Sequence, residues 1–421
     1  MKAQVKHRDN CRLCHSRNVQ LVVKLAPIPL AEKYSNSPSG AGDEVFPIDL
    51  YMCLDCGHVQ ILDVIDSETL WVDYTYHSGQ TKGIVDHFEQ VAEKVIARYR
   101  PARGALVVDV GSNDGSLLRP FLRRGYRVVG IDPAADIARK ATASGVPTIA
   151  ELMSVDIALR IGAEHGSAAV VTAFNVFAHA DDMGSMADSI RTLLAPDGVF
   201  LFEVQYLMDI IDHTLLGTIF HEHMSHHSLK PMTAFLARHD MELIDVERVT
   251  IQKGSIIGTA QPKGGPRKPT PAVAELVALE AERKLDRPET VERFGAKLQA
   301  LKRQTAGLVE QWRKRGAKVA GYGAARSGPT LIAQLGLGKE IDCIFDDHPQ
   351  KVGKYSPGDH IPVVPTSELY KRKPDYVIIL AWIHAKKIVA ANRKYLEEGG
   401  RFVVCCPEVQ VIGADSDTSR L

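Results

Sequence analysis

The chain has 421 residues, enough for two or three domains. Lysine plus arginine and aspartate plus glutamate both number 51, so the formal net charge is zero. A neutral chain has no overall field to gather nucleic acid or an anionic membrane, and no apolar run approaches a membrane span. Because the N-terminus is polar and shows no signal peptide, we expect a cytoplasmic protein without nucleic-acid or membrane partners.

Four of the seven cysteines form two Cys-x-x-Cys pairs, Cys11/Cys14 and Cys53/Cys56. Two such pairs are typical of a tetrahedral zinc site, and four protein ligands leave no open position on the metal. The pattern therefore predicts a structural zinc in a module over residues 1–72. Disulfides or unliganded core thiols are the alternatives.

The next motif is a strand, a small-residue loop and a helix. Residues 105–110 are typical of a buried strand, residues 111–115 (Gly-Ser-Asn-Asp-Gly) form the loop, and a helix starts at Ser116. The following strand ends at Asp132, which lies 132 − 111 = 21 residues beyond Gly111. An acid at this place can accept both hydroxyls of a ribose, so we expect an adenosine-type ligand at this edge of the sheet.

The loop lacks the Gly-x-Gly-x-x-Gly spacing of dinucleotide sites. Asp109 and Asp114 would attract the cationic groups of S-adenosylmethionine and repel phosphates. We therefore expect S-adenosylmethionine, and the residues predicted to bind it are Asp109, Gly111, Ser112, Asn113, Asp114, Gly115, Asp132 and Asn175. A doubly wound domain with no ligand at its loop is the alternative.

Strands alternate with helical segments through the middle of the chain, which indicates βαβ units and a parallel sheet. These strands are expected at 105–110, 127–131, 168–173 and 198–204. A helical stretch over 272–314, interrupted near Pro288, leads to a second α/β unit from Lys318. The sequence thus predicts an α/β protein with a zinc module (1–72), a class I methyltransferase-type Rossmann-like domain (73–245) and a C-terminal Rossmann-like domain (246–421).

Four of the sixteen histidines fall within residues 220–227. In an extended segment, His221 and His223 would lie on the same side, around Glu222. A neighbouring carboxylate raises the basicity of an imidazole, and histidine can abstract a proton near neutral pH. Another polar cluster ends at His179, after a strand, at the edge where α/β sites assemble. These clusters predict a catalytic site; surface or hydrogen-bonded core histidines are the alternative.

These motifs together resemble the sugar-nucleotide C-methyltransferases of deoxysugar biosynthesis, over nearly the whole chain. The resemblance is carried by the two cysteine pairs, the 111–115 loop, the segments 175–179 and 218–225, Gly321-Tyr-Gly-Ala324 and the Asp346 to Pro362 pattern. It implies S-adenosylmethionine-dependent methylation of a carbon next to the ketone, C3 or C5, of a nucleotide-linked 4-keto-deoxysugar.

The resemblance also implies site residues. His223 is the expected base that forms an enolate, Glu222 orients it, and His179 contacts the sugar or enolate. Residues expected to contact substrate are Tyr76, Phe220, Tyr322, Arg326, Lys351 and Trp382. The chain is expected to act as a monomer or weak homo-oligomer.

Three positions depart from the family pattern: Phe220 replaces a tyrosine, Ser327 a lysine and Ile383 an asparagine. Phenylalanine cannot hydrogen-bond, so the role of the missing phenol would move to His221, His226 or His227. Two alternatives follow: methylation of another small natural-product intermediate, or an inactive scaffold. A nicotinamide cofactor at the C-terminal unit is disfavoured because its Gly-x-Gly lacks the third glycine.

Overall fold

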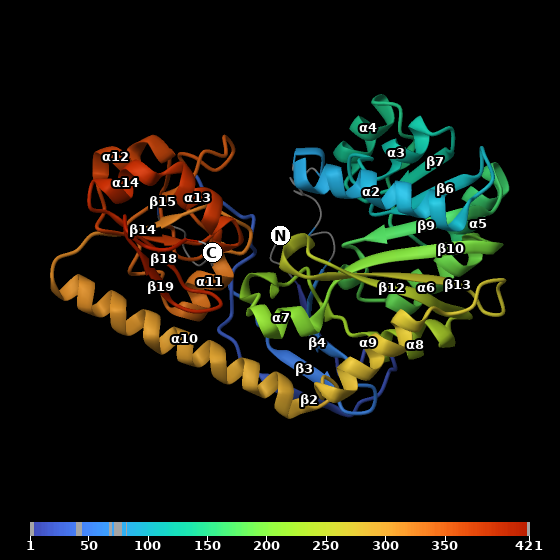
Figure 1. The fold of residues 1–421 in the computed structure, drawn as a ribbon, viewed down its shortest axis with the longest axis horizontal. Helices are drawn as coiled ribbons and strands as arrows, with labels where there is room; N and C mark the ends of the chain where they lie inside the picture. Colours follow the sequence, from blue (N-terminus) through green and yellow to red (C-terminus); the bar gives the residue numbers. More distant parts are fainter. Residues whose placement is uncertain (1–3, 39–43, 67–69, 71–77, 81, 419–421) are drawn as a thin grey trace.

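The computed structural model describes residues 4–38, 44–66, 70, 78–80 and 82–418. Figure 1 shows two α/β lobes at opposite sides of the molecule, with the sheet of the N-terminal part below and between them. We name the three parts after the domains expected from the sequence: the zinc module at the N-terminus, the methyltransferase lobe in the middle of the chain and the C-terminal lobe.

The methyltransferase lobe is built on a seven-stranded sheet of order β12-β13-β10-β9-β6-β7-β8. The strands are β6 (Leu106–Val110), β7 (Arg127–Ile131), β8 (Thr148–Ile149), β9 (Ala168–Phe174), β10 (Leu194–Gln205), β12 (Met241–Val249) and β13 (Ser255–Pro262). The four predicted strands are confirmed. The sheet is not wholly parallel, however, because β13 runs antiparallel to both β10 and β12.

The antiparallel edge extends past the expected domain boundary. The boundary between residues 245 and 246 lies within β12, and β13 continues the same sheet as far as Pro262. The expected domain bounds stay a prediction.

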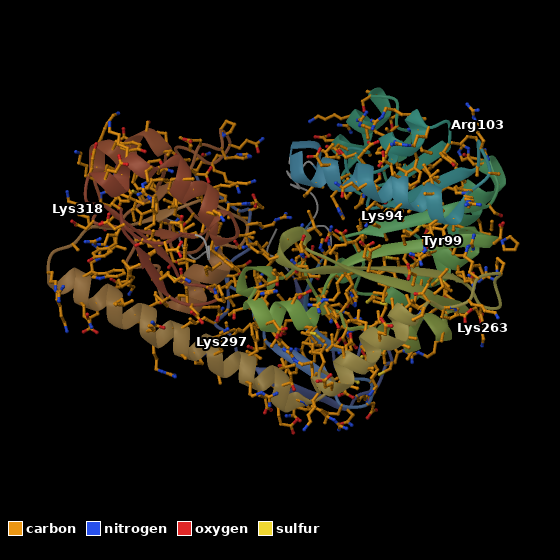
Figure 2. All side chains as sticks on the ribbon, viewed as in Figure 1. Lys94, Tyr99, Arg103, Lys263, Lys297 and Lys318 are labelled. Atoms are coloured by element: carbon orange, nitrogen blue, oxygen red, sulfur yellow. The ribbon has the colours of Figure 1, made fainter. Side chains whose placement is uncertain are left out.

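Helices cover both faces of this sheet. Those of the lobe are α2 (Lys82–Tyr99), α3 (Leu118–Arg123), α4 (Ala135–Ala143), α5 (Val155–His165), α6 (Met183–Leu193), α7 (Leu207–His213) and α8 (Leu229–Arg238). Short 3-10 turns are η1 (Ser78–Gln80), η2 (Phe177–His179), η3 (Leu216–Thr218) and η4 (Ile251–Lys253). Phe88 of α2 packs on one face with Val107, while Val108 joins the core under α6 and α8 on the other. Figure 2 labels Lys94 on α2, whose Nζ lies 2.6 Å from Glu247 Oε1 of β12.

The zinc module carries a small antiparallel sheet that the histidine-rich segment extends. Its strands are β2 (Val19–Val23), β3 (Leu50–Cys53) and β4 (Val59–Ile61), beside a ribbon of β1 (Val5–His7) and β5 (Asp63–Ile65). The fourth strand is β11 (Ser225–His226), which comes from the methyltransferase lobe and pairs Ser225 with Gln60. The two parts therefore share one sheet.

The C-terminal lobe has a six-stranded sheet of order β16-β15-β14-β17-β18-β19, parallel except for β19. Its strands are β14 (Val319–Tyr322), β15 (Ile344–Phe345), β16 (Val363–Val364), β17 (Tyr376–Ile379), β18 (Arg401–Val404) and β19 (Gln410–Ile412). Its helices are α11 (Gly328–Leu335), α12 (Leu369–Arg372), α13 (Ala385–Ala391) and α14 (Arg393–Glu397), with turns η5 (Thr366–Glu368) and η6 (Trp382–His384). The second Rossmann-like unit is confirmed.

Two helices connect the lobes. They are α9 (Pro271–Glu282) and α10 (Pro288–Lys314), so the predicted interruption near Pro288 is present. Figure 1 shows α10 running from the zinc module to the C-terminal lobe. Among the helices in the described part of the chain, none is both long and apolar enough to cross a membrane.

The pairing of β13 with β10 predicts an effect of substitution at Gly258. This glycine lies opposite Phe202, and a Cβ built on it would lie 2.2 Å from Phe202 Cζ. Gly258→Ala should therefore displace the ring and lower the free energy of unfolding by about 1–3 kcal/mol. The midpoint of urea unfolding measures this loss.

Gly307→Ala is the matched control. Gly307 lies within α10, and a Cβ there would meet no atom within 4 Å. Alanine should raise helix stability by about 0.5–1 kcal/mol. If both substitutions change the free energy of unfolding by the same small amount, Gly258 is not in tight contact with the Phe202 ring.

Candidate active site

The four predicted zinc ligands meet in space. The Sγ atoms of Cys11, Cys14, Cys53 and Cys56 all lie within 4.8 Å of one another. Cys11 Sγ is 3.7 Å from Cys56 Sγ, and Cys14 Sγ is 3.5 Å from Cys53 Sγ. Zinc–sulfur bonds of about 2.3 Å in a tetrahedron require sulfurs about 3.8 Å apart, so the cluster fits zinc. With four thiolates around it, this zinc is structural.

The predicted cofactor loop, residues 111–115, follows β6 and has positive φ angles at three of its residues, Gly111, Asn113 and Gly115. Gly111 has φ +72°, and a Cβ on it would lie 2.2 Å from Val176 Cγ2. Asn113 also has a positive φ, of 50°. Its N–H donates to Asp132 Oδ2 at 2.8 Å, and the N–H of Ala134 donates to Asp132 Oδ1 at 2.9 Å. Asp132 lies directly after β7, as the sequence predicted, and its carboxylate holds the 111–115 loop in place.

The other acids of the loop make contacts within the protein. Asp109 is buried, and its Oδ1 accepts a hydrogen bond of 2.6 Å from Thr172 Oγ1. Burial raises the pKa of Asp109 to about 7. Asp114 Oδ1 accepts from Ser116 Oγ, and its Oδ2 accepts from the N–H of Gly79. Asp114 therefore ties the loop to η1.

Glu203 and His87, which the sequence analysis missed, join the predicted residue Asn175 in a polar chain beside the loop. Asn175 Nδ2 donates to Glu203 Oε1 at 3.1 Å, and Glu203 Oε2 lies 2.5 Å from His87 Nε2. Glu203 is only 1% exposed. The available signal was an acid within the apolar run of β10, because buried carboxylates are rare unless paired.

The histidine-rich segment is a turn, so the expectation of an extended segment was wrong. The N–H of His223 donates to the carbonyl of Phe220 at 2.9 Å. His221 and His223 consequently point to different partners. His221 Nε2 lies 3.2 Å from the carbonyl of Phe46 in the zinc module, and its pKa is lowered by burial to about 4.

The fold brings the two predicted polar clusters together, so that the rings of His223 and His179 stack on each other. Their ring centroids are 5.0 Å apart, with planes at 24°. Phe220 also packs against His223, with the two ring centroids 4.1 Å apart. His223 Nδ1 donates to the carbonyl of Thr218 at 2.7 Å. Burial lowers the pKa of His223 to about 4, with a smaller contribution from the charge of Arg326 and against the opposing effect of the hydrogen bond to Thr218.

Four charged side chains from the three parts meet next to this pair. Arg326 Nη1 lies 3.2 Å from Glu222 Oε2, and Arg326 Nε lies 3.7 Å from Glu32 Oε1. Lys351 Nζ is 3.1 Å from Glu32 Oε2. Burial raises the pKa of Glu222 to about 7, against the opposing effect of Arg326. Two predicted substrate residues, Arg326 and Lys351, thus carry carboxylate partners.

Each of the three parts of the molecule holds the segment 217–227. From the C-terminal lobe, Thr330 Oγ1 donates to the carbonyl of Ile219 at 3.1 Å. From the zinc module, the N–H of Ile61 donates to the carbonyl of Met224 at 2.9 Å. Within the methyltransferase lobe, the N–H of Leu207 donates to the carbonyl of His227 at 2.8 Å. The candidate catalytic histidine therefore lies at a three-way junction.

The remaining predicted substrate residues lie in the C-terminal lobe or outside the described residues. Tyr322 OH lies 3.4 Å from Thr366 Oγ1 and from Asn392 Nδ2, within its own lobe. Trp382 is 5% exposed, at the start of η6. Tyr76 falls among the residues that the structure does not describe. Substrate contact by these three side chains stays a prediction.

Comparison with solved structures finds chains that cover just under half of this one. The PH0226 protein from Pyrococcus horikoshii OT3 has a TM-score of 0.37 and 18% identity, covering 47% of this chain and 100% of that chain. Magnesium protoporphyrin IX methyltransferase (ChlM) from Synechocystis PCC 6803 with bound SAM has a TM-score of 0.32 and 16% identity, covering 46% and 88%.

Comparison with sequences and families matches the chain from end to end. "C-methyltransferase NovU" of Streptomyces niveus is 34% identical over 418 residues, which are 99% of this chain and 100% of that protein. Three family models match in succession: "Putative zinc binding domain" at 11–71, "Methyltransferase domain" at 85–246 and "C-methyltransferase C-terminal domain" at 250–407. The chain therefore belongs to the zinc-containing C-methyltransferase family of NovU, and it is an S-adenosylmethionine-dependent methyltransferase that acts on carbon.

Proposed function

We propose that the enzyme methylates a carbon next to the ketone of a nucleotide-linked 4-keto-deoxysugar, with His223 as the base. A C–H bond is acidic enough to ionise only when the resulting carbanion delocalises into a carbonyl. The site must therefore supply a base and groups that stabilise an enolate oxygen, both held in place before reaction. Bound S-adenosylmethionine supplies the electrophilic methyl group.

The hydrogen bond from His223 Nδ1 to the carbonyl of Thr218 carries this proposal. A carbonyl only accepts, so the proton must reside on Nδ1 and the lone pair on Nε2. With its pKa lowered to about 4, the imidazole is neutral at physiological pH. Nε2 is then ready to take a proton from carbon, and that proton later returns to solvent.

A base of such low pKa can form an enolate only where the oxygen is strongly stabilised. His179 is the best-placed donor for that oxygen because its ring stacks on His223 from a separate loop. Phe220 packs against the His223 ring, at the position where the family has a phenol. Here the aromatic ring would exclude water, and hydrogen bonding would pass to His179 instead of to His221, which bonds the zinc module.

Arg326 and Lys351 are the cations that we assign to the diphosphate of the substrate. In the structure they are paired with Glu222 and Glu32. A diphosphate bound there would attract Arg326 away from Glu222 and leave that carboxylate beside His223. Glu222 would then stabilise the imidazolium that forms when Nε2 takes the proton.

For the cofactor, we assign the ribose hydroxyls to Asp132. Each oxygen of this carboxylate already accepts one backbone N–H and retains a second lone pair for a hydroxyl. The surrounding loop, residues 111–115, and Asn175 are proposed to hold the rest of the cofactor. Polar contacts of the loop with η1 would keep its backbone in place.

A second candidate keeps the cofactor and the base but places another carbon acid, on a different small natural-product intermediate, at Nε2. Phe220 and Ile383 favour it, because both replace polar residues of the family where substrate is expected. A panel of substrates distinguishes the two candidates.

Removal of the ribose acceptor should weaken cofactor binding. Asp132→Ala loses the carboxylate and its bond to the loop, so the Kd of S-adenosylmethionine should rise about 10- to 100-fold. Isothermal titration calorimetry measures it. Asp136→Ala is the control, because Asp136 is exposed on α4 and pairs with Arg139. An unchanged Kd in Asp132→Ala would refute the ribose assignment.

Removal of the base should slow turnover strongly and leave cofactor binding unchanged. His223→Gln should lower kcat by about 10²- to 10⁴-fold, with the Kd of S-adenosylmethionine unchanged. The assay uses labelled cofactor with thymidine-, uridine- and guanosine-linked 4-ketosugars. His165→Gln, on the exposed end of α5, is the control. Wild-type enzyme that labels no ketosugar would refute the substrate class, and an active His223→Gln would refute the base.

The pH profile should show both groups that titrate in the proposed mechanism. The mechanism needs Glu222 as a carboxylate, and its pKa is raised to about 7, so kcat/KM should fall as pH drops through about 7. The pKa of His223 is lowered to about 4, so a second fall should come only below about pH 5, as Nε2 becomes protonated. Glu222→Gln should remove the upper fall and keep the lower one. A fall near pH 7 that persists in Glu222→Gln would contradict the assignment of the base to His223.

A further inference from the structure

Arg12 is a buried cation inside the zinc knuckle. It lies between the ligands Cys11 and Cys14, and its side chain is fully buried. The guanidinium donates hydrogen bonds to groups outside the knuckle loop. Those bonds lead in two directions, and each ends next to one member of the imidazole pair.

One direction leads to the segment that carries His223. Arg12 Nη1 donates to the carbonyl of Ile61, and lies 3.4 Å from the carbonyl of Met224, the residue after His223. The same Nη1 donates to Gln60 Oε1 at 3.2 Å. Gln60 and Ile61 form the strand β4 that pairs with β11. Arg12 thus fixes the edge on which the histidine-rich segment rests.

The other direction leads to the segment that carries His179. Arg12 Nε donates to Asp181 Oδ1 at 3.2 Å, and Asp181 lies two residues after His179. Arg8 Nη1 donates to the same oxygen at 2.8 Å and to the carbonyl of Asp181 at 3.0 Å. The zinc module therefore holds the loop at the end of η2 through a charged pair.

Stability alone does not account for this arrangement. Removing a guanidinium from water is costly, and well-packed apolar side chains often replace buried ion pairs with no loss of stability. What an apolar side chain cannot do is hold two separate segments by directional bonds. The planar guanidinium presents its donors in a rigid fork and so fixes the angle between two groups as well as their distance.

We infer that Arg12 is a positioning residue, through which the zinc knuckle fixes His179 and His223 relative to each other. The inference rests on the proposed function for these two imidazoles. The zinc would then serve catalysis without touching substrate, since the cysteines hold the loop from which the guanidinium projects. A displacement of about 1 Å between reacting groups can cost about 100-fold in rate, so a modest loss of alignment should be measurable.

The direct test is the state of the two imidazoles in zinc-loaded enzyme without substrate. Arg12→Met keeps a side chain of similar length and removes the donors. Long-range proton–nitrogen NMR of histidine-labelled protein should show shifted ring resonances for His179 and His223, with zinc content and S-adenosylmethionine affinity unchanged. Arg12→Lys keeps the charge but has a single donor nitrogen, so it should restore one of the two contacts and give smaller shifts.

Kinetics supply the second measurement. On the proposed substrate, Arg12→Met should lower kcat about 10- to 100-fold with KM changed less, and Arg12→Lys should recover part of the loss. Arg238→Met is the matched control: Arg238 Nη2 donates to the carbonyl of Leu13 in the same knuckle but belongs to α8. It should leave both resonances and kcat unchanged.

The outcomes separate this inference from the proposed function. Shifted resonances in Arg12→Met, with none in Arg238→Met, support positioning even if the wild type methylates no ketosugar. If Arg12→Met leaves both resonances unshifted while the wild-type enzyme methylates a ketosugar, the positioning role is overturned and the proposed function stands. If both Arg12 variants lose zinc, Arg12 is a structural part of the metal module and the inference is wrong. Equal shifts in Arg12→Met and Arg238→Met would also overturn it.

Discussion

The hydrogen bond between His223 Nδ1 and the carbonyl of Thr218 is the interaction on which the rest of the site depends. It assigns the lone pair to Nε2, and it holds only if the segment 217–227 keeps its shape. That segment is too short to be rigid by itself. It is held instead by a strand shared with the zinc module, a hydroxyl from α11 and the start of α7. The site is therefore a property of the assembled lobes.

Burial sets the electrostatics of this junction. It keeps His223 neutral and raises the pKa of Glu222, while Arg326 counteracts part of the cost to the carboxylate. A buried polar group without a partner is expensive, so each of these side chains restricts where its neighbours can lie. The same argument applies on the cofactor side, where Asp132 fixes the loop and Glu203 joins Asn175 to His87. Catalytic groups that are fixed before substrate binds need little reorganisation during reaction.

Local patterns were sufficient for much of the fold. Alternating strands and helices and the two cysteine pairs identified the four central strands and the zinc module, and the Gly111 to Asp132 spacing placed the loop after β6 next to the end of β7. Contacts distant in sequence were not predictable in this way. Neither the pairing of β11 with β4 nor the approach of Arg326 to Glu222 has a local signal, because each joins residues from different lobes. The turn at His221 was mistaken for an extended segment for the same reason: tertiary bonds decide its shape.

Hydrogen exchange into substrate tests the central claim most directly. The enzyme is incubated in D₂O with a nucleotide-linked 4-ketosugar and S-adenosylhomocysteine in place of the methyl donor, and mass spectrometry follows deuterium at the carbon beside the ketone. If His223 forms an enolate, wild-type enzyme should introduce deuterium at that carbon without methylation, and His223→Gln should not. Deuterium uptake at equal rates in both proteins, or none in a wild-type enzyme that methylates the same sugar, would contradict the account.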